Sequence, residues 1–367
     1  MNCLKKIFFI VLLFSLTLSY GNKKSYLIEQ MSLDLGIPWG MAFLQKDKLL
    51  VTQKDGQILL LDLLTRKKTF IKNAPEVFYT GQAGLLDVKL SPNYKIDKWI
   101  YFTYVKKDNK KGSTTLSRAK LVKNSLVSWQ DLLVSKSSTE NKVHYGSRIA
   151  FDDNNHVFFS IGDRGIRANS QDLTNHAGTI IRLNMDGSIP FDNPFVNDDK
   201  VLDEIYSYGH RNPQGMFFDK KTKKLWSIEH GPRGGDEINI IEKGKNYGWP
   251  VISYGKEYWA PLAIGEGVAK EGMEQPIKYY IPSIAPSSIL VYSGKLFKEW
   301  EGNIFSGALR LTHLNRIILN DKNETIKEER LLKEIYERIR NVIEDEDGYI
   351  YVSTDTGRIL RLKPNDR

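Results

Sequence analysis

The sequence predicts an all-β fold, a six-bladed β-propeller built from four-stranded antiparallel blades. One pattern carries the prediction: an aromatic or β-branched run, a polar turn, and a second apolar run with alternating polar residues. It occurs six times at uneven intervals, at residues 49–63, 99–121, 157–187, 225–244, 304–321 and 349–364. Recurring strand pairs with turn signals between them, and few helical stretches, are typical of small antiparallel sheets repeated around a ring.

A ring of blades must be closed, and the chain offers a strand for this purpose near its beginning. The strand-like segment SYLIEQMSL, residues 25–33, is expected to complete the last blade beside residues 349–364. Helical propensity is concentrated in one stretch, residues 323–339. No linker divides the chain after its first segment, so we predict a single propeller domain over residues 22–367.

The first segment has the features of an export signal. Lys5 and Lys6 precede an uninterrupted apolar run that ends near Gly21. Such a run suits a cleaved signal peptide, residues 1–21, and is short for a membrane span; a retained anchor is the alternative. We therefore expect a periplasmic or secreted protein without stable membrane insertion after cleavage. Cys3, the only cysteine, lies in this segment, which excludes a disulfide framework in the mature chain.

The formal net charge of +9 raises the question of nucleic-acid binding. The lysines and arginines are scattered, however, as in KKDNKKG (106–112) and DKKTKKL (219–225), where they stand beside turn residues and acids. A nucleic-acid binder gathers them on one face among aromatic residues. We expect no nucleic-acid partner, and attribute part of the excess to solvated hairpin tips and part to an anionic ligand.

The stretch EIYSYGHRNPQGMFFD, residues 204–219, places four polar side chains on a turn between two strand-like flanks: His210, Arg211, Asn212 and Gln214. On the surface these residues would cost nothing, whereas each buried group without a partner costs roughly 1–3 kcal/mol. The stretch is therefore either a solvated turn or part of a binding site. Because the loops of a propeller converge on its axis, it is a candidate wall of an axial pocket.

Four further turns combine glycine with charged or amide residues, and a fifth segment carries two arginines and an asparagine; they follow one another in a specific order. They are GQAGLLDVKLSP (81–92), HYGSRIAFD (144–152), IGDRGIRANSQD (161–172), EHGPRGGDEINIIEKGKNYGWP (229–250) and ERIRNV (337–342). Together with GHRNPQG they resemble the glucose/sorbosone dehydrogenase family, and within it the soluble aldose sugar dehydrogenases. The resemblance runs from about residue 30 to the C-terminus. It implies a six-bladed propeller that uses pyrroloquinoline quinone (PQQ) and Ca²⁺.

PQQ is a flat tricarboxylate with an electrophilic carbonyl, so its site needs fixed cations and hydrogen-bond donors. Arg338 and Arg340 are spaced to share one face of a strand, and guanidinium groups suit carboxylates. Alone, this pair is more typical of a solvated strand edge than of a binding site. The resemblance implies a larger set of quinone contacts: Gln82, Arg211, Asn212, Ala308, Arg310, Arg338 and Arg340.

The resemblance also implies two calcium sites. Calcium accepts backbone carbonyl oxygens, and Gly231 and Pro232 match the family's ligands beside the quinone. Glu237 and Tyr247 have the spacing of a second, structural site. Without the resemblance, Glu237 would be interpreted as a surface acid and the glycine-rich run as a loop.

Oxidation of a sugar hydroxyl requires a general base, and imidazole is the usual choice near neutral pH. Six histidines compete, and the resemblance assigns this role to His144, with Arg211 stabilising the developing oxyanion. Glucose-specific members carry an acid immediately before this histidine, where this chain has Val143. We therefore expect a less strongly oriented base and a broad range of aldoses.

These residues predict an enzyme that oxidises the C1 hydroxyl of aldose sugars to aldonolactones, with hydride transfer to PQQ and reoxidation by an external electron acceptor. The protein would be a monomer or a homodimer. Two alternatives stay open. One is a sugar- or protein-binding propeller of the same family without catalysis. The other is a calcium-dependent lactonase, which needs carboxylate and amide side chains around its ion in place of arginines.

Overall fold

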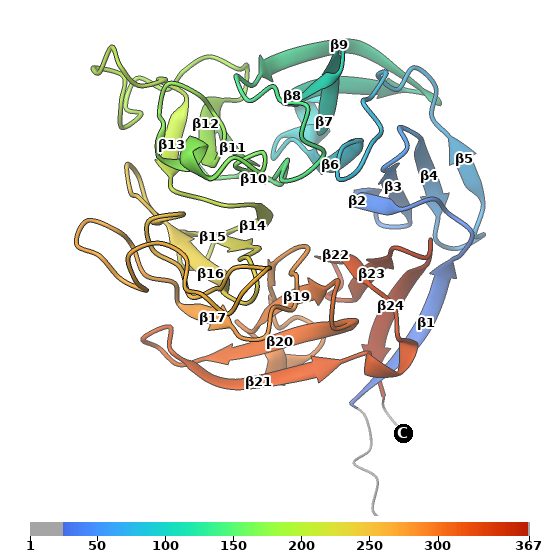
Figure 1. Ribbon diagram of the computed structural model, residues 1–367. Helices are drawn as coiled ribbons and strands as arrows, with labels where there is room; N and C mark the ends of the chain where they lie inside the picture. The colour runs from blue at the N-terminus through green and yellow to red at the C-terminus, as the bar shows by residue number, and fades with distance from the viewer. Residues whose placement is uncertain (1–24, 366–367) are drawn as a thin grey trace, which may run out of the picture.

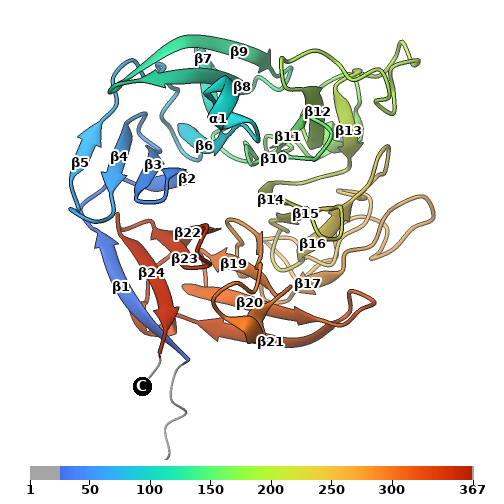
Figure 2. The same ribbon diagram turned by 180° about the vertical axis from the view of Figure 1, so that it is seen from behind.

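The computed structural model describes residues 25–365, so the predicted signal peptide lies outside the described residues. Six four-stranded antiparallel sheets are arranged radially around a central axis (Figure 1). The view from behind shows the same ring, with strand β24 beside strand β1 (Figure 2). This arrangement confirms the predicted six-bladed β-propeller. No helix within residues 25–365 has the length and apolar character needed to cross a membrane.

Each blade begins at the axis, and its strands follow outward in chain order, except that the outermost strand of the last blade is β1. The first three blades are β2 (Pro38–Gln45), β3 (Lys48–Gln53), β4 (Ile58–Asp62) and β5 (Lys68–Phe70); β6 (Leu85–Leu90), β7 (Trp99–Asp108), β8 (Lys111–Val122) and β9 (Ser125–Val134); and β10 (Ile149–Phe151), β11 (His156–Ile161), β12 (Thr179–Asn184) and β13 (Ile205–Tyr208). Short helices, α1 (Tyr94–Asp97) and the 3₁₀ turn η1 (Arg167–Gln171), lie in connections of the second and third blades.

The last three blades follow the same plan. They are β14 (Pro213–Asp219), β15 (Lys224–Glu229), β16 (Asp236–Ile241) and β17 (Lys278–Tyr280); β18 (Leu290–Val291), β19 (Ile304–Ala308), β20 (His313–Leu319) and β21 (Thr325–Leu331); and β22 (Ile339–Glu344), β23 (Ile350–Thr354), β24 (Ile359–Pro364) and β1 (Tyr26–Ser32). Two further 3₁₀ turns are η2 (Lys298–Trp300) and η3 (Lys333–Ile335). Each of the six repeats found in the sequence contains the second and third strands of one blade.

The ring is closed by β1, which pairs antiparallel with β24 as expected from residues 25–33. Tyr26 lies opposite Pro364, and Gln30 lies opposite Leu360. Across this pair, Arg361 Nη2 donates to Glu29 Oε2 at 2.6 Å. The last blade therefore consists of three strands from the end of the chain and one from its beginning.

The stretch with helical propensity, residues 323–339, forms no α-helix. It forms β21, the turn η3 and the start of β22. Strand β21 pairs with β20, where Arg316 Nη1 donates to Glu329 Oε2 at 2.7 Å and Asn315 Nδ2 to Glu328 Oε1 at 2.9 Å. These cross-strand contacts outweigh the intrinsic helix preference of glutamate and lysine.

Hydroxyl groups in the second strands connect neighbouring blades near the axis. In four blades, a serine or threonine donates to a buried carbonyl of the next blade. The pairs are Thr52 to Leu86 at 2.6 Å, Thr103 to Ser147 at 2.6 Å, Ser160 to Pro213 at 3.1 Å and Ser353 to Pro38 at 2.7 Å. These bonds satisfy carbonyls that have no sheet partner on that side, and they fix the inner ends of these four blades against their neighbours.

Apolar side chains fill the wedge between adjacent blades. Tyr101 of β7 and Phe159 of β11 are fully buried in one cluster, and Phe305 of β19 and Val352 of β23 lie in another. The hydrophobic core is thus divided among the blade interfaces. The polar groups that the first strands carry meet at the axis, where the candidate site lies.

Candidate active site

A cavity of about 280 Å³ lies at one end of the propeller axis. Residues from the first strands of the blades, or from the loops just before them, line it: Trp39, Leu86, Gly146, Gln214, Ala285 and Arg340. All six blades therefore contribute to its wall. Gln82 and Arg338, two of the predicted cofactor contacts, also line it.

The turn GHRNPQG is buried beside this cavity, so it is not a solvated turn. His210 and Asn212 are fully buried, and Arg211 and Gln214 are each 7% exposed. Glu229 accepts from the Arg211 main-chain N–H at 2.7 Å and lies 2.9 Å from His210 Nδ1. The turn thus runs from the end of β13 to the start of β14 with its main chain anchored to β15.

Two donors on this turn have no protein partner. The Arg211 Nε and Asn212 Nδ2 atoms are buried and make no hydrogen bond among the described residues. The other side of the Asn212 amide is fixed, because Oδ1 accepts from the Gly146 N–H at 3.2 Å and from Gln214 Nε2 at 3.1 Å. A buried unpaired donor is costly to a protein, and these two donors lie on the turn whose Gln214 lines the cavity.

His144 adjoins the cavity and is held in place at both its main chain and its ring. The Gln82 side chain accepts from the His144 N–H at 2.7 Å. Asp163 Oδ1 lies 2.6 Å from His144 Nδ1, and Asp163 Oδ2 accepts from Trp249 Nε1 at 2.8 Å. His144 has a positive φ of 55°, a strained conformation that is common at functional sites.

The carboxylate of Asp163 corrects the expectation drawn from Val143. An acid before the histidine is absent, but the acid that orients the ring follows strand β11 and belongs to the IGDRG turn. Asp163 lies within the IGDRG motif, but no feature of the sequence marks it as the partner of His144. His144 is therefore firmly oriented, and the substitution at position 143 gives no reason to expect a loosely held base.

The surroundings of His144 favour its neutral form. Burial lowers the pKa of His144 below its usual value, and the hydrogen bond to Asp163 offsets part of that effect. Burial acts to raise the pKa of Asp163, but the hydrogen bond and charge of His144, the charge of Arg211 and the hydrogen bond from the Gly165 N–H together hold it below the ordinary value. An ionised Asp163 keeps the proton on Nδ1 and leaves Nε2 as the acceptor of a proton.

Three cations surround one carboxylate in the cavity. Arg338 Nε and Arg340 Nε each donate to Asp355 at 2.8 Å, so the two arginines share a partner. The Arg340 side chain is 12% exposed and that of Arg338 is 52% exposed. Lys54, which sequence reasoning missed, also lines the cavity and donates to the Gly81 carbonyl. Burial and the neighbouring Arg340 lower the pKa of Lys54.

The structure does not bring the side chain of Arg310 into this group. Arg310 is exposed and is absent from the residues that line the cavity, whereas its neighbour Leu309 lines it. Ala308 is fully buried at the end of β19 and forms a bridge with Pro286. Their roles as cofactor contacts remain predictions.

The four predicted calcium residues line one small cavity of about 10 Å³: Gly231, Pro232, Glu237 and Tyr247. The Gly231 carbonyl accepts from Arg211 Nη1 at 2.8 Å. The Tyr247 hydroxyl donates to the Ile240 carbonyl at 2.6 Å and accepts from the Glu242 N–H at 2.8 Å, so its main-chain oxygen is the better potential ligand.

An acidic pair faces the same small cavity. Burial and the adjacent Glu229 raise the pKa of Glu237, because two carboxylates close together resist ionisation. A cation between them would relieve this repulsion. Within residues 25–365, no cluster of three or more His, Cys, Asp or Glu side chains is arranged to hold a metal, so carbonyl oxygens would have to complete any site.

Fold and site together define a six-bladed propeller with an axial cavity that combines an aspartate-oriented histidine with a cluster of cations. Residues 35–361 match the family model described as Glucose / Sorbosone dehydrogenase. The chain belongs to this family.

Named relatives agree with this assignment. The chain is 36% identical over 351 residues to the aldose sugar dehydrogenase YliI of Escherichia coli, covering 92% of this chain and 93% of the relative. The apo structure of the soluble aldose sugar dehydrogenase of Escherichia coli superimposes with a TM-score of 0.89 at 34% identity, covering 93% of this chain and all of the other. A PQQ-bound aldose sugar dehydrogenase of Streptomyces coelicolor gives a TM-score of 0.77 at 26% identity, covering 93% and 98%.

Proposed function

We propose that the protein is a PQQ- and Ca²⁺-dependent dehydrogenase that oxidises the C1 hydroxyl of aldose sugars to aldonolactones. The observation that carries this proposal is the pairing of His144 with Asp163 at 2.6 Å beside a cavity lined by cations. The names of the relatives support an oxidoreductase acting on sugars.

The residues present fit the quinone. Lys54, Arg338 and Arg340 face a single counter-charge, Asp355, so the cavity wall has an excess of positive charge suited to a tricarboxylate. The unpaired Arg211 Nε and Asn212 Nδ2 atoms are further donors on the adjoining turn. When bound, PQQ supplies the electrophilic carbonyl that accepts a hydride.

The residues also fit calcium, although the ligand set consists mainly of carbonyls. The main-chain oxygens of Gly231 and Pro232 would hold the ion beside the quinone. Glu237, with the carbonyl of Tyr247, would hold the structural ion. Hard oxygen ligands of this kind are the ones that Ca²⁺ prefers.

The protein's own part in the reaction is proton transfer and charge stabilisation. His144 Nε2 accepts the proton of the C1 hydroxyl, and Asp163 stabilises the imidazolium that forms. Arg211, which is 7% exposed, stabilises the negative charge that develops during the reaction. Burial of these groups keeps water away and strengthens their interactions.

The proposal is tested by spectroscopy of the purified protein. After addition of Ca²⁺ and PQQ, an aldose should change the spectrum of the bound quinone to that of its reduced form. Quinone binding without reduction by any aldose would contradict the enzyme and favour a binding propeller. Absence of quinone binding would contradict the cofactor assignment.

We further propose that the protein is exported, that residues 1–21 are removed, and that an external acceptor reoxidises the quinone. The support is the apolar segment after Lys5 and Lys6. The intact mass of protein isolated from the host's exported fraction should correspond to a chain that begins near residue 22. A full-length mass would contradict cleavage and favour a retained anchor.

A further inference from the structure

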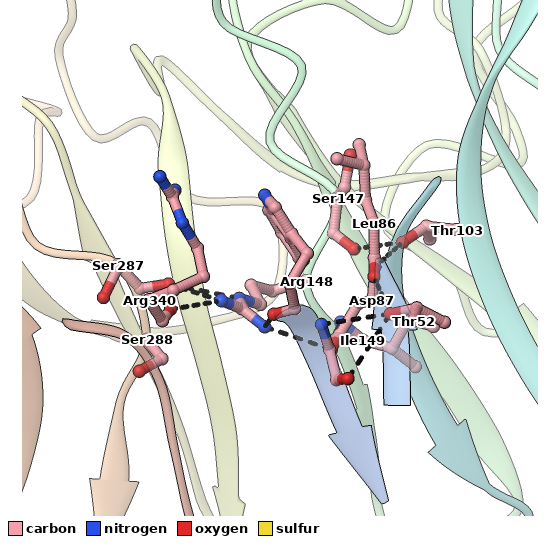
Figure 3. Close-up of polar contacts among 12 residues, drawn as sticks. Thr52, Leu86, Asp87, Thr103, Ser147, Arg148, Ile149, Ser287, Ser288 and Arg340 are labelled. Carbon is pink, nitrogen blue, oxygen red and sulfur yellow. Dashed lines mark hydrogen bonds and ion pairs between the residues drawn. The ribbon is translucent and has the colours of Figure 1, made fainter. Parts of the chain in front are cut away.

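Arg148 crosses the propeller axis beneath the cavity. It precedes β10 directly, and only 3% of it is exposed. Figure 3 shows its guanidinium between Ser287 and Arg340 on one side and Asp87 on the other. The guanidinium carbon also lies 3.9 Å from the centre of the Trp39 ring, which is itself part of the cavity wall.

The guanidinium of Arg148 donates to every other blade. Its partners are the carbonyls of Gln214 at 2.7 Å, Ser287 at 2.7 Å, Arg340 at 3.0 Å and Trp39 at 3.3 Å, and the Asp87 carboxylate at 3.1 Å. These residues lie in, or just before, β14, β18, β22, β2 and β6. One side chain of the third blade therefore joins the first strands of the other five.

Three of these partners also line the cavity: Trp39, Gln214 and Arg340. The Arg148 guanidinium donates a hydrogen bond to the main-chain carbonyl of each of these three residues. The position of the Arg340 guanidinium, which contacts Asp355, thus depends on a main chain that Arg148 anchors.

The same contacts separate two cavities along the axis. A second cavity of about 540 Å³ is lined by Lys89, Phe217 and Val342, among others. On strand β6, Leu86 lines the first cavity and Lys89 the second, and Asp87 between them contacts Arg148. Arg148 and its partners therefore form a floor that closes the cofactor cavity on this side.

Arginine is specifically suited to this position. Its planar fork carries five N–H donors, whereas lysine offers three donors around one point. Asp87, 1% exposed, is the carboxylate that pairs with Arg148 at 3.1 Å, and its second oxygen accepts from the Ile149 N–H at 3.0 Å. Lysine could keep the pairing with Asp87 but could not reach all the carbonyls.

We propose that Arg148 is a positioning residue that sets the floor of the cofactor cavity and, through the main chain of Arg340, Gln214 and Trp39, the geometry with which the quinone is bound. This inference rests on the proposed function, since it assigns a role within that same cavity. It predicts an effect on quinone affinity beyond any effect on stability.

The test compares Arg148→Lys with Arg316→Lys. Arg316 is a matched control because it is also buried, at 8% exposure, and hydrogen-bonded to Asn303 and Glu329, but it does not line the cavity. PQQ is titrated in the presence of Ca²⁺ at a temperature well below the Tm of each variant. We expect Arg148→Lys to raise Kd about tenfold or more and Arg316→Lys to change it less than about twofold. Equal affinities in Arg148→Lys and the parent would overturn the proposal.

Hydrogen exchange gives a second measurement that does not need the quinone. In Arg148→Lys, amides around residues 38–40, 213–215 and 339–341 should exchange faster, while those of β20 should not. Failure of the parent protein to bind PQQ would contradict the proposed function. Unchanged exchange in these three segments of Arg148→Lys would overturn the positioning role independently of that result. If Arg148→Lys does not fold, both measurements are made on Asp87→Asn instead. Unchanged exchange and unchanged PQQ affinity in that variant would overturn the positioning role of Arg148.

Discussion

Asp163 and His144 form a close side-chain pair at the site, with Asp163 Oδ1 2.6 Å from His144 Nδ1. The two residues flank the first two strands of the third blade, and Trp249 from the neighbouring blade fixes the second oxygen of Asp163. The aspartate is 2% exposed at its side chain and the histidine 14%. A blade interface therefore defines the tautomer of the proposed base.

Asp163→Asn should slow the reaction by roughly 10²- to 10⁴-fold, because an amide no longer stabilises the imidazolium or enforces the Nδ1–H tautomer. The contact with Asp163 raises the pKa of His144 against the effect of burial. Its loss should lower that pKa further, so the acid limb of the kcat/KM profile should move to lower pH. Asp172→Asn, an exposed acid on the same loop, is the control. An unchanged profile would contradict the pairing.

His144→Gln should separate catalysis from cofactor binding. Glutamine keeps a polar group of similar reach, so PQQ and Ca²⁺ affinities should stay nearly unchanged while reduction of bound quinone slows roughly 10²- to 10⁴-fold. Higher pH should restore part of the rate, since hydroxide can take the proton. His156→Gln, remote and bonded to Asp152, should behave as the parent. Parent-like rates in His144→Gln across pH 6 to 9 would assign the base elsewhere, with His230 the next residue to test.

Arg340→Ala should weaken PQQ binding more than Arg338→Ala does. The Arg340 side chain is 12% exposed and that of Arg338 52%, so solvent screens the second charge more strongly. A charge-assisted hydrogen bond in a buried site contributes roughly 1.5–3 kcal/mol, about ten- to hundredfold in Kd. Quinone titration of both variants provides the measurement.

Arg310→Ala completes this series. Its exposed side chain predicts a smaller loss of affinity than either Arg338→Ala or Arg340→Ala, despite the family resemblance that assigns it a contact. A loss as large as that of Arg340→Ala would show that Arg310 enters the cavity when the quinone binds.

Glu237→Gln should reduce the stabilisation of the protein by calcium. Binding to the native state alone contributes about 2.7 kcal/mol at a hundredfold excess over Kd, which should raise the Tm of the parent by several degrees. The variant loses the ligand and should show a smaller rise. Glu271→Gln, an exposed acid, should respond as the parent does. Calorimetry with calcium and with chelator decides the outcome, and an undiminished rise in Glu237→Gln would exclude it as a ligand.

The blades were predictable because each carries its own local strand pair and turn. The closing strand was predictable because one strand-like segment at the beginning of the chain was left over. Residues 323–339 have helical propensity because glutamate and lysine favour helix in isolation. They form strand β21 because the partners of Glu328 and Glu329 lie on a neighbouring strand.

The candidate site was only partly predictable for a related reason. Motif order pointed to His144 and the arginines, but the partner of His144 lies 19 residues away, beyond two strands. Arg148 lies within the HYGSRIAFD motif, but the Arg340 carbonyl to which it donates is 192 residues away in the sequence. Only the arrangement of the ring shows which distant carbonyls lie within its reach.

Closure of the ring by β1 and β24 has a consequence for how the chain acquires its structure. Arg361 and Glu29, which bond across this seam, are 332 residues apart. Contacts of such sequence separation form late, because a long loop must close before they contribute. The last blade cannot assemble until ribosomal synthesis has delivered residues 359–364, so the first strand to be made must wait, unpaired, for the last. During this interval the unpaired strand must be kept from pairing with other chains.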